Sequence, residues 1–439
     1  MRAPGTMTVW RFGWVPCGHM SFSFVWRGSC AIIVGEELHV GREIVMPRFS
    51  VVVPAFNGAA HIAECLESLL SQGVDDLEVI VADDRSSDET PALVRALAER
   101  DPRVRLVERA ENGGTLRARR DGVLASTGDY VLLVDQDDAL APGALEEIEA
   151  ALTEHDPDIL HFGVSVIAEN AAAEGAAAGM TGFLTPPSRR LEGEKILQTQ
   201  FSGDMGFDWH VHHKAYRGEL ARRAWSAARD VRLTLSDDLY ASFLLCSMAS
   251  TYVAVPDAPW YEYHLGRGET FGARLTFEDV LATSERDHAA LTLIEEFARS
   301  GVVSRDDWPA RVADVRDRLI EHVMNELHDG LSAEGQRAAI DGVLSLWPAD
   351  AVAGELYRFV RDRAYALFDA RTCPKSSDEL HRLLADARRA DELVSGPVSP
   401  RYAIMKEAAE RHLGDLESLK DERSVRGVVR HLLARLRTR

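Results

Sequence analysis

Cysteine, positive charge and long apolar runs are all scarce in this chain of 439 residues. The five cysteines are scattered without a Cys-x-x-Cys pair, which argues against a disulfide framework or a cysteine-based zinc site and indicates reduced thiols. No apolar run reaches the roughly 18 residues that a membrane-spanning helix needs. Acidic residues outnumber basic ones by 70 to 50, and the net charge of −20 argues against a broad nucleic-acid-binding surface. We therefore expect a globular, cytoplasmic protein.

The start of the chain differs from the rest in composition. It holds Trp10, Trp14 and Trp26, but no clean apolar core followed by a small-residue cleavage site. Met46 then comes just before the first clear strand pattern. We interpret residues 1–45 as an N-terminal extension that is either poorly ordered or the product of a start site assigned too early.

Strand and helix patterns alternate after this extension. The predicted strands are Phe49–Val53, Leu77–Ala82, Val104–Val107, Tyr130–Val134 and, after a helix at 142–153, Asp158–Val164. Short connections between such units imply an α/β fold, with a mostly parallel sheet and helices on both faces. We assign residues 46–270 to this domain.

Two further segments have distinct patterns. Alanine- and glycine-rich sequence at 168–180 predicts a loop or short linker within the α/β domain. From Thr276 on, apolar residues recur at helical spacing, so we assign residues 275–439 to an α-helical C-terminal region.

An acidic motif, Asp135-Gln136-Asp137-Asp138, directly follows the strand Tyr130–Val134. A buried strand delivers its last side chains to one edge of the sheet, where ligands bind in open α/β folds. Crowded carboxylates repel one another unless a cation neutralises them, and hard divalent cations prefer oxygen ligands. The motif therefore predicts a Mg²⁺ or Mn²⁺ site with phosphates nearby. The alternative is a solvated turn that caps a helix opened by Pro142.

Two polar segments upstream of this motif also carry chemistry. Asp83 and Asp84 follow the second predicted strand, where a carboxylate can accept a hydrogen bond from an N–H group of a ligand. Asn112-Gly113-Gly114 leads into a helix, where glycine lets backbone N–H groups approach an anion. Capping of the next helix is the alternative role of Asp83 and Asp84.

Four motifs in this order resemble those of the family 2 glycosyltransferases. They are Phe49–Asn57, Val81–Asp88, Asn112–Arg119 and Asp135–Asp138. The resemblance covers roughly residues 47–265 and implies a GT-A fold, a nucleotide-diphosphate-sugar donor with UDP favoured, and inversion of the sugar. It also implies a glycan or lipid-linked hydroxyl acceptor and a role in bacterial surface-polysaccharide or teichoic-acid assembly.

The resemblance gives individual residues a role. An inverting enzyme needs a base for the acceptor hydroxyl, and the resemblance implies Asp238, with Asp237 as the alternative; capping of the following helix is a second role for this pair. The implied nucleotide contacts are Pro54, Phe56, Asn57, Asp84, Arg119 and Asp135. The implied ligands of Mn²⁺ or Mg²⁺ are Asp137, Asp135 and His264, and the implied diphosphate or acceptor contacts are Lys214, Trp209 and Arg267. The chain departs from the family in Phe56, where tyrosine is frequent, and in Arg85, where glycine is common.

The histidines of this region have alternative interpretations. His210 and His212 alternate along the sequence, and on a strand they would share one face and suit a metal. The resemblance instead favours acceptor or diphosphate contact by this segment. An isolated histidine such as His264 is more often an ordinary polar residue than a ligand.

Three other classes of protein compete with a glycosyltransferase. A haloacid-dehalogenase-like phosphohydrolase would use Asp135 as nucleophile and Asp137 as acid, but its signature lies on an early strand and continues with Gly-Thr. A nucleotidyltransferase would want a glycine-rich, basic loop after the first strand, which 54–58 lacks. A non-catalytic scaffold would not need Asp135, Asp137 and Asp238 intact.

The C-terminal segment 423–437 is basic within an acidic chain. Its valines and leucines recur at i, i+3, i+4 and i+7, so a helix there would be amphipathic. Such a helix can lie on an anionic membrane surface, which predicts peripheral contact with the inner membrane face. The alternative is that this face packs on the helical region or on a second subunit.

Overall fold

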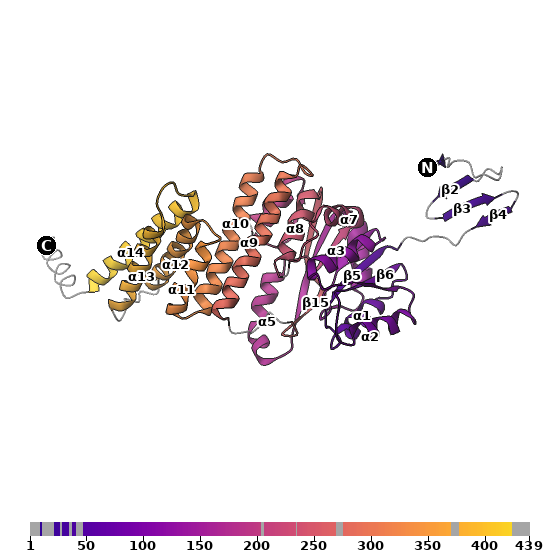
Figure 1. Ribbon diagram of the computed structural model, residues 1–439, viewed down its shortest axis with the longest axis horizontal. Helices are drawn as coiled ribbons and strands as arrows, with labels where there is room; N and C mark the ends of the chain where they lie inside the picture. The colour runs from indigo at the N-terminus through magenta and orange to yellow at the C-terminus, as the bar shows by residue number, and fades with distance from the viewer. Residues whose placement is uncertain are drawn as a thin grey trace, which may run out of the picture. The chain divides into compact units, whose positions relative to one another are not determined.

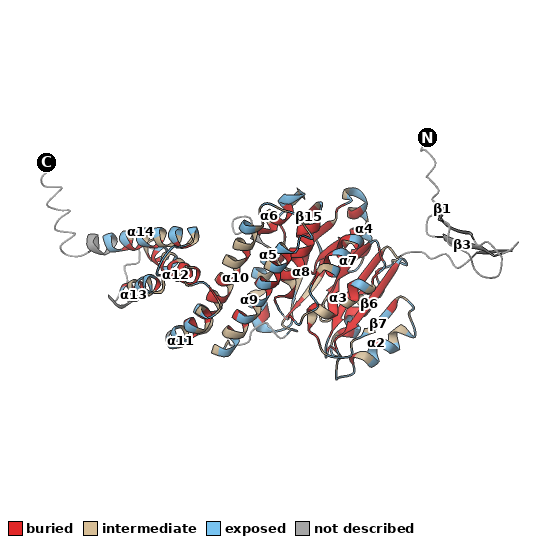
Figure 2. Ribbon diagram, turned by 45° about the horizontal axis from the view of Figure 1, so that its top comes forward, coloured by how far each residue is buried: buried red, intermediate tan, exposed pale blue. Residues whose placement is uncertain are grey.

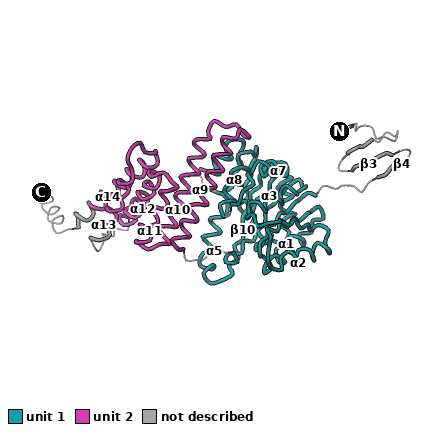
Figure 3. The backbone as a smooth tube through the Cα atoms, viewed as in Figure 1, with its two compact units in different colours: residues 1–200, 208–272 teal, residues 201–207, 273–439 magenta. Residues whose placement is uncertain are grey.

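The computed structural model describes residues 47–202, 206–233, 235–268, 275–369 and 377–423, together with four short strands nearer the N-terminus. The chain divides into two compact units (Figure 3). The first comprises Met1–Gln200 and Asp208–Gly272, and the second comprises Phe201–Phe207 and Ala273–Arg439. The first is an α/β unit and the second is helical, which confirms the predicted fold class.

The four N-terminal strands form a small antiparallel sheet in the order β1 (Val9–Trp10), β2 (Phe22–Trp26), β3 (Ser29–Val34) and β4 (Glu37–Val40). The rest of the predicted extension lies outside the described residues, so its interpretation stays a prediction.

The main sheet of the first unit has nine strands. They are β5 (Phe49–Ala55), β6 (Leu77–Asp83), β7 (Val104–Glu108), β8 (Tyr130–Leu133), β9 (Ala139–Leu140), β10 (Ile159–Ala168), β11 (Arg189–Glu192), β14 (Lys214–Arg217) and β15 (Thr251–Leu265). Their order is β11-β15-β10-β14-β8-β5-β6-β7, with β9 paired to β15. Strands β5, β6, β7, β8, β10 and β15 run in one direction, and β9, β11 and β14 run against them. The sheet is therefore mostly parallel, as predicted.

Helices cover both faces of this sheet (Figures 1 and 2). On one face lie α1 (Ile62–Leu70), α2 (Thr90–Ala98) and α4 (Ala144–His155); on the other lie α3 (Thr115–Ala125), α7 (Gly218–Ala227) and α8 (Asp237–Met248). Because strand side chains alternate, Val51 and Val53 join the core beneath α1 while Val52 points to α3. A Cβ at Gly122 of α3 would lie 2.4 Å from Val52 Cγ1, so glycine lets the helix approach the strand.

The prediction of a loop at 168–180 is wrong. Helix α5 (Ala171–Leu184) occupies most of this segment, and the Asn170 side chain caps it by accepting a 3.0 Å bond from the Ala173 N–H. The high helix propensity of its alanines outweighs the cost of its three glycines. The first unit also contains α6 (Glu194–Gln200).

The second unit consists of long helices and a short hairpin. The helices are α9 (Phe277–Arg299), α10 (Trp308–Gly330), α11 (Ala333–Leu344), α12 (Ala349–Asp369), α13 (Ser377–Leu393) and α14 (Pro400–Arg423), and β12 (Phe201–Ser202) pairs with β13 (Gly206–Phe207). A capping box between Thr276 and Asp279 fixes the start of α9. Within the described part of the chain, every helix is too short or too polar to cross a bilayer. Of the predicted basic helix, 424–439 lies outside the described residues.

Candidate active site

A single guanidinium joins three of the predicted site carboxylates. Arg119, on α3, is 4% exposed, and its Nη2 donates to Asp135 Oδ1 at 2.7 Å. Its Nη1 donates to Asp237 Oδ2 at 2.7 Å and also to Asp238 Oδ1. Asp135 follows β8, whereas Asp237 and Asp238 open α8, so the fold gathers residues from three elements at one edge of the sheet.

The site holds more negative than positive charge. Burial lowers the pKa of Arg119, but the charges of Asp238, Asp135 and Asp237 outweigh it and raise that pKa well above its ordinary value. Burial, helped by the charge of Asp238, raises the pKa of Asp237 to about 7, although Arg119 opposes the shift. Asp237 therefore holds a proton far more readily than an exposed aspartate.

Helix capping does not explain either acidic segment. The N-cap of α4 is Gly143, so the acidic motif does not cap the helix after it. The N-cap of α8 is Ser236, whose side chain makes no capping bond, and Asp237 and Asp238 lie in the first turn. Both carboxylates turn toward Arg119, as the two bonds above show.

Asp138 fastens the acidic motif to β15. Its carboxylate accepts 2.7 Å and 2.8 Å bonds from the Tyr261 hydroxyl and the His264 N–H. The Tyr261 oxygen in turn accepts a 3.3 Å bond from the Asp135 N–H. Burial, with the charges of Asp135 and Asp137, raises the pKa of Asp138 well above its ordinary value. Tyr261 is a site residue that the sequence did not reveal, because its phenol meets the motif only across strands.

His264, at the end of β15, is held like a metal ligand. Its Nδ1 lies 2.6 Å from Glu169 Oε1, while its buried Nε2 has no hydrogen-bond partner among the described residues. Metal-binding histidines commonly pair one nitrogen with a carboxylate in this way. Glu169 also lies 2.8 Å from Nε of Arg267, whose Nη1 approaches the Asp137 carbonyl oxygen at 3.4 Å.

The predicted metal ligands Asp135, Asp137 and His264 do not have their ligand atoms gathered closely enough to form a ready-made metal site. Burial, followed by the charge of Asp135, raises the pKa of Asp137. Among the described residues, however, the one set of three histidine, cysteine or acidic side chains whose ligand atoms lie within 4.8 Å of one another is elsewhere, at His161, Asp208 and His213. The assignment of Asp135, Asp137 and His264 to a metal stays a prediction.

Asp84 anchors the glycine loop. Its two carboxylate oxygens accept 2.7 Å bonds from the N–H groups of Gly113 and Gly114, and Arg109 Nε lies 3.0 Å away. The anion that these N–H groups approach in the structure is therefore Asp84 itself. At the neighbouring Asp83, Oδ2 accepts a bond from the Ser86 N–H, and the buried Oδ1 has no partner among the described residues. Of the two aspartates, Asp83 is thus the one with a carboxylate oxygen left to accept a hydrogen bond.

The loop after β5 presents an aromatic ring. Phe56 is 46% exposed, while Pro54 is buried in the strand. The Gln136 side chain brackets Phe56 by accepting from its N–H at 3.0 Å and donating to its C=O at 3.1 Å. Asn57 Oδ1 accepts a 2.8 Å bond from the Ser87 N–H, which ties this loop to the one after β6. Sequence patterns gave no sign of the Gln136 contact, since it joins residues 80 positions apart.

Lys214 is buried and pairs with an acidic side chain. Its buried ammonium is 2.8 Å from Asp208 Oδ2 and donates to the His210 carbonyl. Trp209 is half-buried, and its ring lies edge-on to that of His210 with centroids 6.4 Å apart. Contact of Lys214 and Trp209 with diphosphate or acceptor stays a prediction.

The sequence of the α/β unit matches a known protein family. The model of the family "Glycosyl transferase family 2" matches residues 50–217. This segment belongs to family 2. The match favours a glycosyltransferase over the phosphohydrolase alternative, and it ends within the α/β unit, at the last residue of β14.

Named relatives share part of the chain. The uncharacterized glycosyltransferase EpsJ of Bacillus subtilis is 29% identical over 41% of this chain and 51% of its own length. The succinoglycan biosynthesis protein ExoO of Rhizobium meliloti is 41% identical over 24% of this chain and 29% of its own. The chain thus spans about half the length of EpsJ and less of ExoO. A crystal structure of S. aureus TarS residues 1–349 with UDP-GlcNAc, 18% identical, covers 85% of this chain and 91% of its own with a TM-score of 0.49.

Proposed function

We propose that this chain is an inverting glycosyltransferase that moves a sugar from a nucleotide-diphosphate sugar, with UDP favoured, to a hydroxyl acceptor. The observation that carries the proposal is the bridge from Arg119 to Asp135, Asp237 and Asp238. Direct displacement needs donor and acceptor bound side by side. One guanidinium spans a carboxylate of the donor motif and the candidate base, so the two half-sites adjoin.

Asp238 is the proposed base. Its side chain is 18% exposed, whereas that of Asp237 is 4% exposed, so Asp238 is the one that an acceptor hydroxyl can reach. It would take the hydroxyl proton as the new C–O bond forms and the bond to the diphosphate breaks. Arg119 holds the Asp238 carboxylate in place, and the more deeply buried Asp237 accepts a hydrogen bond from the same guanidinium.

Asp137, Asp135 and His264 are the proposed ligands of Mn²⁺ or Mg²⁺. The unpaired Nε2 of His264 and the raised pKa of Asp137 both fit a cation beside them. When bound, such an ion neutralises the charge of the leaving diphosphate. Arg267, which reaches the Asp137 carbonyl, adds a second positive charge on the same side.

The exposed Phe56 ring is the proposed stacking surface for the base, with Pro54 behind it and Asn57 shaping the loop. In this proposal, Asp83 or Asp84 accepts a hydrogen bond from the imide N–H of uracil, and Asp83 has a carboxylate oxygen without a partner among the described residues.

We extend the proposal to bacterial surface-polysaccharide assembly, supported by the similarity to ExoO, with a glycan or lipid-linked acceptor.

Thermal unfolding with UDP or GDP, each with and without Mn²⁺, tests this function. UDP should stabilise the protein more when Mn²⁺ is present, by a few kcal/mol at about 100 times the dissociation constant. Asp137→Asn should remove the Mn²⁺-dependent part. The matched control is Asp129→Asn, an exposed aspartate of the same unit, which should keep it. If UDP stabilised the protein equally well in excess chelator, the metal assignment would be refuted. If neither UDP nor GDP stabilised it, the proposal of a nucleotide-sugar donor would be refuted.

A further inference from the structure

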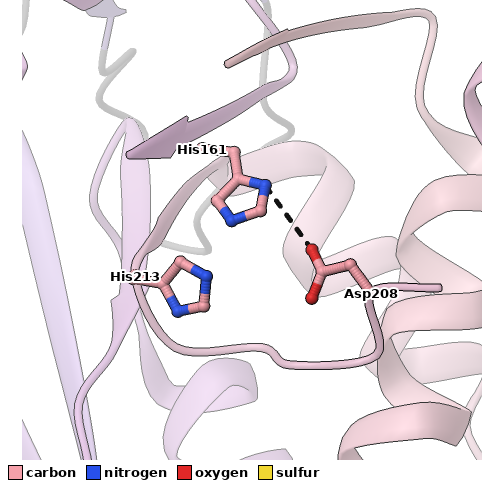
Figure 4. A group of neighbouring side chains, drawn as sticks. All are labelled: His161, Asp208 and His213. Carbon is pink, nitrogen blue, oxygen red and sulfur yellow. Dashed lines mark ion pairs between the residues drawn. The ribbon is translucent and has the colours of Figure 1, made fainter. Parts of the chain in front are cut away.

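A second group of ligand side chains lies apart from the acidic motif. One nitrogen of His161, on β10, one of His213, just before β14, and one oxygen of Asp208 lie within 4.8 Å of one another (Figure 4). The two imidazole rings have centroids 4.6 Å apart. Asp208 Oδ2 lies 3.5 Å from Nδ1 of His161, and Figure 4 marks this ion pair with a dashed line. All three residues belong to the first unit.

Both imidazoles are fixed from their Nδ1 side and open at Nε2. His161 Nδ1 lies 2.5 Å from the Tyr252 hydroxyl, and His213 Nδ1 lies 2.7 Å from His212 Nδ1. His161 and His213 are 2% and 1% exposed, yet neither Nε2 atom has a hydrogen-bond partner among the described residues. A buried polar atom without a partner is costly, so two of them on neighbouring rings call for a ligand.

Burial disfavours the charged form of both imidazoles. It lowers the pKa of His161 and of His213 well below the ordinary value, and the positive charge of Lys214 adds to the effect. Neutral imidazole is the form that donates a lone pair to a metal. Asp208, whose pKa is well below its ordinary value despite its burial because of the charge of Lys214, supplies a carboxylate.

We propose that His161, His213 and Asp208 bind a divalent transition-metal ion, for which Zn²⁺ is the best fit. Two imidazole nitrogens and one carboxylate oxygen suit Zn²⁺ and leave a fourth position for water, whereas Mg²⁺ prefers oxygen ligands alone. Zinc–ligand bonds of about 2.0–2.1 Å place tetrahedral ligand atoms roughly 3.3 Å apart. Ligand atoms that lie up to 4.8 Å apart must therefore approach one another by about 1.5 Å to reach this geometry.

Lys214 competes with the metal for Asp208. Its ammonium is 2.8 Å from Asp208 Oδ2, so a bound dication must displace it or remove its proton. The site is therefore a weak one in the wild-type chain. Replacing Lys214 by an uncharged side chain should strengthen it.

The proposed zinc site adjoins the candidate base without sharing its residues. The backbone N–H of Val211, within the segment that joins Asp208 to His213, lies 3.5 Å from Asp238 Oδ2. The His212 ring stacks on that of Tyr261 with centroids 5.0 Å apart. Zinc bound here would fix this segment, and its binding does not depend on the proposed function.

Titration of the metal-free, full-length protein with Co²⁺ in excess Mg²⁺ tests the proposal. One Co²⁺ per chain should bind and give the intense visible absorption of tetrahedral coordination. Zn²⁺ should displace it, and Asp137→Asn should not affect it. His161→Gln and His213→Gln should each weaken binding at least about tenfold. The matched control is His155→Gln, on α4 of the same unit, which should bind Co²⁺ like the wild type.

A variant expected to bind the metal more tightly tests the site even if the histidine variants fail to fold. Lys214→Met keeps all three ligands and should bind Co²⁺ about tenfold more tightly, because the competing charge is gone. Melting curves without metal report whether each variant is folded. No tetrahedral Co²⁺ signal in either the wild type or Lys214→Met, or a signal that survives both histidine substitutions in folded protein, would overturn the site.

Discussion

The two units each bury a cluster of ion pairs, and the clusters differ in balance. In the first unit, one arginine, Arg119, serves three carboxylates. In the second, the buried Glu355 lies between Arg358 and Arg401, and Arg401 also meets Glu321 at 3.2 Å. Each acid there has an arginine of its own.

The difference separates a structural ion cluster from one suited to binding. Buried charges are costly unless paired, so a cluster that serves only stability should compensate itself, as that around Glu355 does. The cluster around Arg119 lies at the ends of parallel strands and retains excess acid, which raises the pKa of Asp237. Excess acid at such a position suits a site that receives a proton or a cation.

The largest effect should come from Asp238→Asn. Loss of the Asp238 carboxylate should slow sugar transfer, measured as release of UDP from a UDP-sugar, by a factor of about 10²–10⁴. The reason is that the amide cannot take a proton in the transition state. Affinity for UDP, measured by calorimetry, should stay nearly unchanged. The matched control is Glu321→Gln in the balanced cluster, which should turn over normally. If Asp237→Asn is the crippling change instead, the assignment within the pair is wrong.

The second effect compares the two arginine clusters directly. Arg119→Met leaves three carboxylates unpaired and should lower the free energy of unfolding by about 3–5 kcal/mol. Arg401→Met should cost less, since Glu355 keeps Arg358. Urea unfolding, analysed for the transition of each unit, measures both losses. Equal losses would show that the imbalance of charge has no energetic consequence.

The third prediction concerns pH. The pKa of Asp237 is about 7 in the folded protein and near its ordinary value in the unfolded chain. Over about pH 4 to 7 the folded state therefore binds a proton that the unfolded state has released, so stability falls as pH rises. Asp237→Asn cannot titrate, so its stability should fall less over this range than that of the wild type, in which Asp137 and Asp138 also have raised pKa values. Urea unfolding across that range measures the difference. Asp129→Asn, at an exposed site, should keep the wild-type profile; a parallel profile for Asp237→Asn would contradict the shift.

The smallest effect should come from Arg85, outside both clusters. Its φ is +66°, in the left-handed region that favours glycine. Arg85→Gly should raise the free energy of unfolding by up to about 1 kcal/mol. Arg100→Gly, at an exposed position without a positive φ, should lower it instead. A loss of stability at both positions would mean that the turn is not strained.

Local pattern determined much of the fold. The strands at Phe49, Leu77, Val104 and Tyr130 formed where β-branched and apolar runs predicted them, because side-chain alternation and burial act over a few residues. The acidic motif likewise stood at a strand end, where the chain direction alone places it. Among the described residues, composition misled at 168–180, where alanine favoured a helix over the loop suggested by glycine.

Only the tertiary structure decided which charges meet. Strand β14 inserts antiparallel between β8 and β10, and the chain then returns through α7 to bring α8 against α3. Arg119 thereby reaches Asp238 across 119 positions of sequence, and His161 faces His213 across two strands. No periodicity encodes such a meeting, because it follows from strand order rather than from neighbouring residues. The sequence supplied the carboxylates and histidines. The topology of the sheet decided that three carboxylates share one arginine, and that His161 and His213 are buried with Nε2 atoms that have no partner among the described residues.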